Sequence, residues 1–172
     1  MVTLQMDDHI FSVDAEKTRD YYLKHSCCDC PACRNYYAAV KSRLKKLDAF
    51  LCEFGVDITR PDELGWGDAD DLMNYLFAAY TVCGAMVSSG KYQLDINDGP
   101  PLHLEIEKGC VPGEEKSQNY FVISVFNIRL PWVIDESLPT AEKKKNLIKP
   151  GDFSGNRAHL PNAETEFAQS SA

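Results

Sequence analysis

Five side chains that can bind a metal or exchange electrons stand within nine residues of one another. The stretch HSCCDCPAC carries His25, Cys27, Cys28, Cys30 and Cys33. Zinc takes four tetrahedral ligands, most often thiolates and imidazoles. This concentration of soft ligands predicts a zinc site built from one segment. The expected ligands are Cys30, Cys33, Cys27 and His25, with Cys28 as a substitute.

A second possibility is thiol redox chemistry at Cys30 and Cys33. The residues between them complete a C-P-A-C motif at an expected helix start. Backbone amides and the helix dipole stabilise a thiolate there, which lowers the pKa of Cys30. The motif resembles the active site of thioredoxins and glutaredoxins. Those families place a buried apolar strand before the motif, whereas residues 18–29, TRDYYLKHSCCD, are polar and helix-like.

A third possibility is that the cysteines only pack. Cysteine is often buried as a small hydrophobic residue, and Cys33 falls on the apolar face of the following helix. Strong zinc signals carry a second C-x-x-C pair a dozen or more residues away. The remaining cysteines, Cys52, Cys83 and Cys110, are single. Zinc binding, redox chemistry and packing therefore all remain open.

The element that must position the cluster is a long helix. Apolar residues recur at steps of three and four from the cluster onward, which is typical of one face of an amphipathic helix. Gly55 stands where a C-terminal cap belongs. We therefore expect one helix over about residues 31–54. Its apolar stripe comprises Cys33, Tyr36, Tyr37, Val40, Leu44, Leu47, Leu51 and Phe54.

The rest of the chain predicts mostly strands. Residues 3–13 alternate around two aspartates, which indicates an N-terminal hairpin, and Asp14 is expected to cap a short helix over 15–25. Residues 58–71 predict a turn-rich connector. Strands are expected within 72–84, 91–96, 102–109 and 119–128, with a helix as the alternative over 70–80. The expected class is α+β, with the long helix packed on an antiparallel sheet of four or more strands.

Composition indicates one domain and a tail. Residues 1–136 carry the apolar patterning and predict a single α+β domain. Residues 137–172 are polar and unpatterned and carry prolines and glycines. Such a segment buries too little apolar area to offset its chain entropy, so we expect a largely disordered C-terminal tail.

Charge and cysteine count narrow the classes of function. The net charge of −8 disfavours nucleic-acid binding, which depends on neutralising phosphates, and it suits a basic protein partner. Seven cysteines cannot all pair within one chain. The beginning, MVTLQMDDHIF, lacks a signal-like apolar region, and no apolar run approaches the roughly 20 residues that span a membrane. A reducing, cytoplasmic location is expected.

A motif around the cysteines supports a family resemblance. The pattern C-x-C-x-x-C-R-N-[YF]-[YF] leads into a helical stretch that ends in FGVD. It is carried by Cys28, Cys30, Cys33, Arg34, Asn35, Tyr36 and Tyr37. The chain resembles a small family of uncharacterised bacterial proteins, with similarity extending through YTVCG and LPW over roughly residues 1–136. The resemblance implies a bacterial, cytoplasmic origin and brings no catalytic residues with it.

These observations favour a noncatalytic protein. The sequence has no G-x-S-x-G elbow, Walker loop, H-E-x-x-H or dinucleotide fingerprint, so an enzyme is disfavoured. For Arg34 we expect an ion pair or loop-organising hydrogen bonds rather than an anion site. The leading expectation is a soluble interaction module of regulatory or immunity type. The alternative is a zinc-binding or thiol-redox protein centred on the cluster from Cys27 to Cys33.

Overall fold

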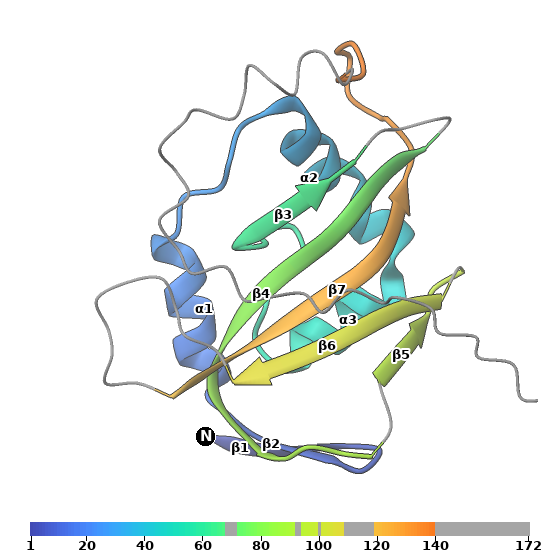
Figure 1. The fold of residues 1–172 in the computed structure, drawn as a ribbon. Coiled ribbons are helices and arrows are strands. Elements are labelled where there is room, and N and C mark those ends of the chain that lie inside the picture. Colours follow the sequence, from blue (N-terminus) through green and yellow to red (C-terminus); the bar gives the residue numbers. More distant parts are fainter. Residues whose placement is uncertain (68–71, 92–93, 100, 109–118, 140–172) are drawn as a thin grey trace, which may run out of the picture. The chain divides into compact units, whose positions relative to one another are not determined.

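The computed structural model describes residues 1–67, 72–91, 94–99, 101–108 and 119–139. A seven-stranded antiparallel sheet runs through it in the order β1-β2-β4-β7-β6-β5, and β3 pairs with β4 off this path (Figure 1). The 16-residue strand β4 joins most of the sheet, because it pairs with β2, β3 and β7. The strands are β1 Val2–Met6, β2 His9–Val13, β3 Glu63–Trp66, β4 Met73–Ser88, β5 Leu94–Asn97, β6 Pro101–Lys108 and β7 Tyr120–Leu130.

Among the described residues three helices complete the α+β fold, the class that the sequence predicted. They are α1 Ala15–Lys24, α2 Pro31–Arg43 and α3 Lys45–Glu53. Helix α1 begins as predicted, because the Asp14 side chain accepts a hydrogen bond from the Lys17 amide at 3.2 Å. Buried side chains of α2 and α3 belong to the same core cluster as the inner face of the sheet. At its centre the hydroxyls of Tyr36 and Tyr80 lie 2.6 Å apart.

The expected single helix over residues 31–54 is wrong. The helix is interrupted at Leu44, whose φ of −115° and ψ of 68° lie outside the helical region. The side chain of Asp98, just after β5, accepts hydrogen bonds from the amides of Lys46 at 2.8 Å and Leu47 at 2.9 Å. Asp98 therefore caps a new helix, α3, from a distant part of the chain. The apolar pattern continues across the break because both helices bury residues in the same core.

The predicted N-terminal hairpin and the strand from residue 73 onward are confirmed, but one strand was not predicted. The N-terminal hairpin is present, and Asp7 at its turn adopts a left-handed φ of 51°. Residues from Met73 onward form a strand, which excludes the alternative helix over the described part of residues 70–80. The segment 58–71 is not only a connector, because β3 within it pairs with β4. The strand is only four residues long and contains Gly65, so the sequence pattern did not reveal it.

The described residues belong to one compact unit, Met1–Thr140. The predicted tail, 137–172, lies outside the described residues from residue 140 onward, so its expected disorder stays a prediction. Within the described part of the chain, no helix is long and apolar enough to cross a membrane.

Candidate metal centre

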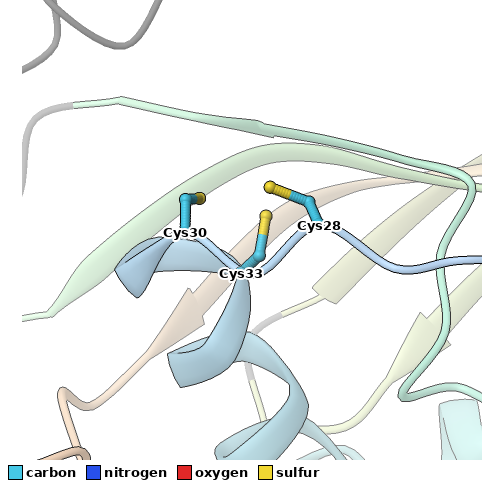
Figure 2. Close-up of side chains that lie close together, drawn as sticks. All are labelled: Cys28, Cys30 and Cys33. Atoms are coloured by element: carbon cyan, nitrogen blue, oxygen red, sulfur yellow. The ribbon is translucent and has the colours of Figure 1, made fainter.

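Three of the five predicted ligands converge. The Sγ atoms of Cys28, Cys30 and Cys33 all lie within 4.8 Å of one another, and Figure 2 shows them on the same side of the chain. Cys28 belongs to the loop before α2, Cys30 is the N-cap residue of α2, and Cys33 lies in its first turn. Pro31 suits the first helical position, where no amide donor is needed. The C-x-x-C step at a helix start thus brings two sulfurs together, and the loop adds a third.

The other two predicted ligands are placed differently. The Nε2 atom of His25 lies 3.5 Å from Asp62 Oδ1, and His25 is not a member of the group of three sulfurs. Cys27 is exposed on the same loop and also stands outside that group. The distant Cys52 and Cys83 do not join the cluster either. Cys110 lies outside the described residues.

Hydrogen bonds to backbone carbonyls fix the loop that carries Cys28. Arg60 Nη2 donates to the carbonyl of His25 at 2.6 Å, and the Tyr37 hydroxyl donates to the carbonyl of Cys28 at 3.1 Å. Arg34 donates to the carbonyl of Asp29. These donors come from α2 and from the segment before β3, so the loop is held from two sides. Such support fixes the position of a ligand before any ion binds.

Arg34 and Asn35 anchor the start of α2 to the segment that follows β7. Arg34 Nη2 lies 2.6 Å from both carboxylate oxygens of Glu136, so the residue makes an ion pair and organises the loop, as expected. The fully buried Asn35 donates to the Pro131 carbonyl at 3.1 Å and accepts from the Val133 amide at 2.7 Å. The R-N pair of the motif is therefore scaffolding for the cysteines.

A strand residue that the sequence reasoning missed also supports the helix start. Tyr75 on β4 donates from its hydroxyl to the Ala32 carbonyl at 2.8 Å and accepts from Asn35 at 3.1 Å. Burial, the largest cause, raises the pKa of Tyr75 to about 12, so the hydroxyl keeps the proton that it donates. Tyr75, Arg60 and Glu136 are remote from the cluster in sequence, and no local pattern signals their role.

The three thiols differ in their readiness to ionise. A hydrogen bond from the Cys33 thiol is the main cause that lowers the pKa of Cys30 to about 5, with burial acting in the opposite direction. The amides of Cys33 and Ala32 and the Cys28 thiol also favour the Cys30 thiolate. The pKa of Cys33 is raised, first by that shared hydrogen bond and then by burial. The shared hydrogen bond therefore favours the thiolate form of Cys30, which is the form that binds metals and attacks disulfides.

The arrangement fits a thiophilic metal ion. Zinc–sulfur bonds of about 2.3 Å place tetrahedral sulfurs about 3.8 Å apart, so the three sulfurs need only a small contraction to share an ion. They leave one position of a tetrahedron for another ligand. Cys27 is close enough that its charge contributes to raising the pKa of Tyr37, after burial and Cys33. Tyr37 itself stays a hydrogen-bond donor to the same loop.

No protein-family model, curated protein or solved structure matches the chain. The resemblance to the bacterial family therefore stays a prediction, and the geometry of the three sulfurs carries the functional argument.

Proposed function

We propose that the protein binds one zinc ion through Cys28, Cys30 and Cys33. The observation that carries the proposal is the convergence of three sulfurs within 4.8 Å at the start of α2. A redox pair needs two cysteines and buried packing needs no convergence, whereas a zinc ion uses every sulfur of the group. The hydrogen bonds that hold the loop carbonyls support the same assignment, because metal ligands need fixed positions.

Cys27 is our candidate for the fourth ligand. It adjoins Cys28 and its side chain is exposed, so a rotation of that side chain would turn its sulfur towards the ion while the loop carbonyls stay held. Four thiolates around Zn²⁺ carry a net charge of −2. The positive end of the α2 dipole offsets part of this charge. The Arg34 guanidinium, whose pKa is raised chiefly by its hydrogen bond to Glu136, also interacts with the Cys30 charge.

Zinc in this position serves structure rather than catalysis. It would tie the loop to the first turn of α2, and its binding free energy would add to the free energy of folding. This role suits a noncatalytic interaction module of regulatory type, which the acidic charge and the absence of catalytic motifs in the sequence favour. The exposed loop around Cys27 and Cys28 would then present a fixed surface to a basic protein partner.

The lowered pKa of Cys30 favours thiol–disulfide exchange as the second candidate. The Cys30 thiolate would attack a substrate disulfide and release one of its sulfurs as a thiolate. Cys33, after losing its proton to solvent, would attack the mixed disulfide and release the other sulfur. The substrate disulfide is thereby reduced to two thiols, and the protein keeps a Cys30–Cys33 disulfide.

Metal content separates the two candidates. The protein is purified under reducing conditions without chelator, and zinc is counted per chain by elemental analysis. We expect one zinc ion in the unmodified chain and in Cys52→Ser, which serves as a control for an exposed cysteine outside the cluster. Cys28→Ser, Cys30→Ser and Cys33→Ser should each lose most of it. A metal-free protein that forms a reversible Cys30–Cys33 disulfide would favour the redox candidate instead.

A further inference from the structure

A cavity away from the three sulfurs points to a second site. It has a volume of about 410 Å³ and is lined by residues of α1, α2, α3 and the segment before β3. None of the three clustered cysteines lines it. The volume falls in the range of small-molecule pockets, roughly 300–1,000 Å³. We propose that this cavity binds a small monocarboxylate with an apolar body, an activity separate from zinc binding.

The charges around the cavity favour a monoanion. Three cationic side chains line it, Arg19, Lys41 and Arg60, against two carboxylates, Asp48 and Asp57, for a net formal charge of +1. No ion pair joins any of the three cations to another described residue. The Oδ1 atom of Asp57 already accepts hydrogen bonds from the amide and hydroxyl of Thr59. The cations therefore remain available to a ligand.

Arg60 supplies the most specific sign of a missing partner. Its Nε is buried and has no hydrogen-bond partner among the described residues, while its Nη2 donates to the His25 carbonyl. Buried donors are nearly always paired, and an unpaired one is costly. A carboxylate is the acceptor that a guanidinium recognises best, because it takes two parallel hydrogen bonds. Because Nε is buried, a ligand carboxylate in the cavity would reach it only after the Arg60 side chain shifts, and it would then satisfy the unpaired donor.

The remaining lining requires an apolar ligand body. Tyr22 and Val56 are buried apolar walls, and Leu23 is a large hydrophobic side chain that stays 76% exposed. The Tyr22 hydroxyl donates to Asp62 and to the Thr81 carbonyl, so only the aromatic ring of Tyr22 is available to a ligand in the cavity. An alkyl or aryl group in the cavity would cover Leu23 and these walls. A simple inorganic anion would leave these apolar side chains exposed to water.

Isothermal titration with octanoate, octan-1-ol and octylamine tests this assignment. The three probes share one alkyl chain and differ in charge. Octanoate should bind, and octan-1-ol and octylamine should bind at least about tenfold more weakly, because they lack the charge-assisted hydrogen bonds. Arg60→Gln should weaken octanoate binding about tenfold. Amide shifts of Gly55 and Val56 in NMR spectra should report the same site.

Two further variants test the proposal even if Arg60→Gln fails to fold. The Arg19 and Lys41 side chains make no hydrogen bond or ion pair with other described residues, so Arg19→Gln and Lys41→Gln should fold normally and each weaken octanoate binding. Lys45 is exposed and does not line the cavity, so Lys45→Gln should leave octanoate binding unchanged. Equal binding of octanoate and octan-1-ol, no binding of octanoate, or equal losses in Lys45→Gln and Lys41→Gln would overturn the proposal.

Discussion

At the scale of single residues, Cys30 and Cys33 have opposite roles because they share one hydrogen bond. The Cys33 thiol donates it and the Cys30 thiolate accepts it, so the pKa of Cys30 falls to about 5 while that of Cys33 rises. Because the pKa of Cys30 is lower in the folded state than in the unfolded state, the Cys30 thiolate stabilises the folded state. This stabilisation is complete above the ordinary thiol pKa and is lost as the pH falls through about 5.

This difference predicts the pH dependence of alkylation. In reduced, metal-free protein, the rate of Cys30 modification by iodoacetamide should rise with a midpoint near pH 5 and be on its plateau at neutral pH. Mass spectrometry of the modified peptide identifies the site. Cys33→Ala should move the midpoint upward, because it removes the largest cause of the shift. A midpoint near the ordinary thiol value of about 8.5 would contradict the described hydrogen bond.

Asn35 should be the most sensitive of the scaffold residues. Asn35→Ala removes partners from the Pro131 carbonyl, the Val133 amide and the Tyr75 hydroxyl, all near the start of α2. We expect a loss of about 2–4 kcal/mol in the free energy of unfolding, measured by urea denaturation. Lys45→Ala, on an exposed site, should cost under about 0.5 kcal/mol. Similar losses for the two variants would mean that Asn35 does not carry the anchor.

The cysteine cluster could be found from sequence, but the choice among its members could not. The nine-residue spacing identified the right segment. Which sulfurs converge depends on the loop carbonyls that Arg60, Arg34 and Tyr37 hold, and on Asp62, beside which the His25 imidazole lies. These partners are set by tertiary contacts, which a local pattern does not contain.

At the scale of elements, the break between α2 and α3 shows how periodicity misleads. Apolar residues continue at helical spacing through Leu44, and Leu44 itself is buried, so the pattern predicted one helix. The break depends on Asp98, which caps α3 from the end of β5. Lys46 reinforces the contact by donating from Nζ to the Asn97 carbonyl at 2.7 Å. A cap supplied from another element leaves no signal in the helix sequence.

Asp98→Ala should therefore destabilise the protein by about 0.5–2 kcal/mol, the usual cost of losing an N-cap. Asp98→Asn keeps an acceptor oxygen and should cost only a small part of that. Thermal or urea denaturation monitored by circular dichroism measures both. If the alanine variant is as stable as the unmodified protein, the cap is not what separates the two helices.

At the scale of the whole molecule, alternation predicted the strands but not their order. The pairing of β5 with β6 follows from the three residues that separate them, whereas eleven residues separate β6 from β7. The pairing of β4 with β2, β3 and β7 could not be deduced, because β4 is long enough to serve several partners. Gly65 shows why β3 was missed. A side chain there would come within 2.5 Å of the Phe77 ring, so the strand needs a residue of low strand propensity.

The boundary near residue 137 can be tested by limited trypsin digestion. The polar composition of residues 137–172 predicts early cleavage after Lys143, Lys144 or Lys145. The remaining core keeps Glu136, the partner of Arg34, and should retain its melting temperature within a few degrees. A core that unfolds on trimming would show that the tail contributes to the fold and that the expected domain, 1–136, is too short.

The most direct test of the zinc proposal is titration of the reduced, metal-free protein with Co²⁺. Cobalt takes tetrahedral thiolate sites and reports them through absorption by its d electrons and by sulfur-to-metal charge transfer. We predict saturation at one equivalent with a spectrum of three or four thiolates, full displacement by Zn²⁺, and a raised melting temperature. Cys33→Ser should lose this spectrum and Cys52→Ser should retain it. An octahedral spectrum without sulfur charge transfer, or identical spectra from both variants, would contradict the proposal.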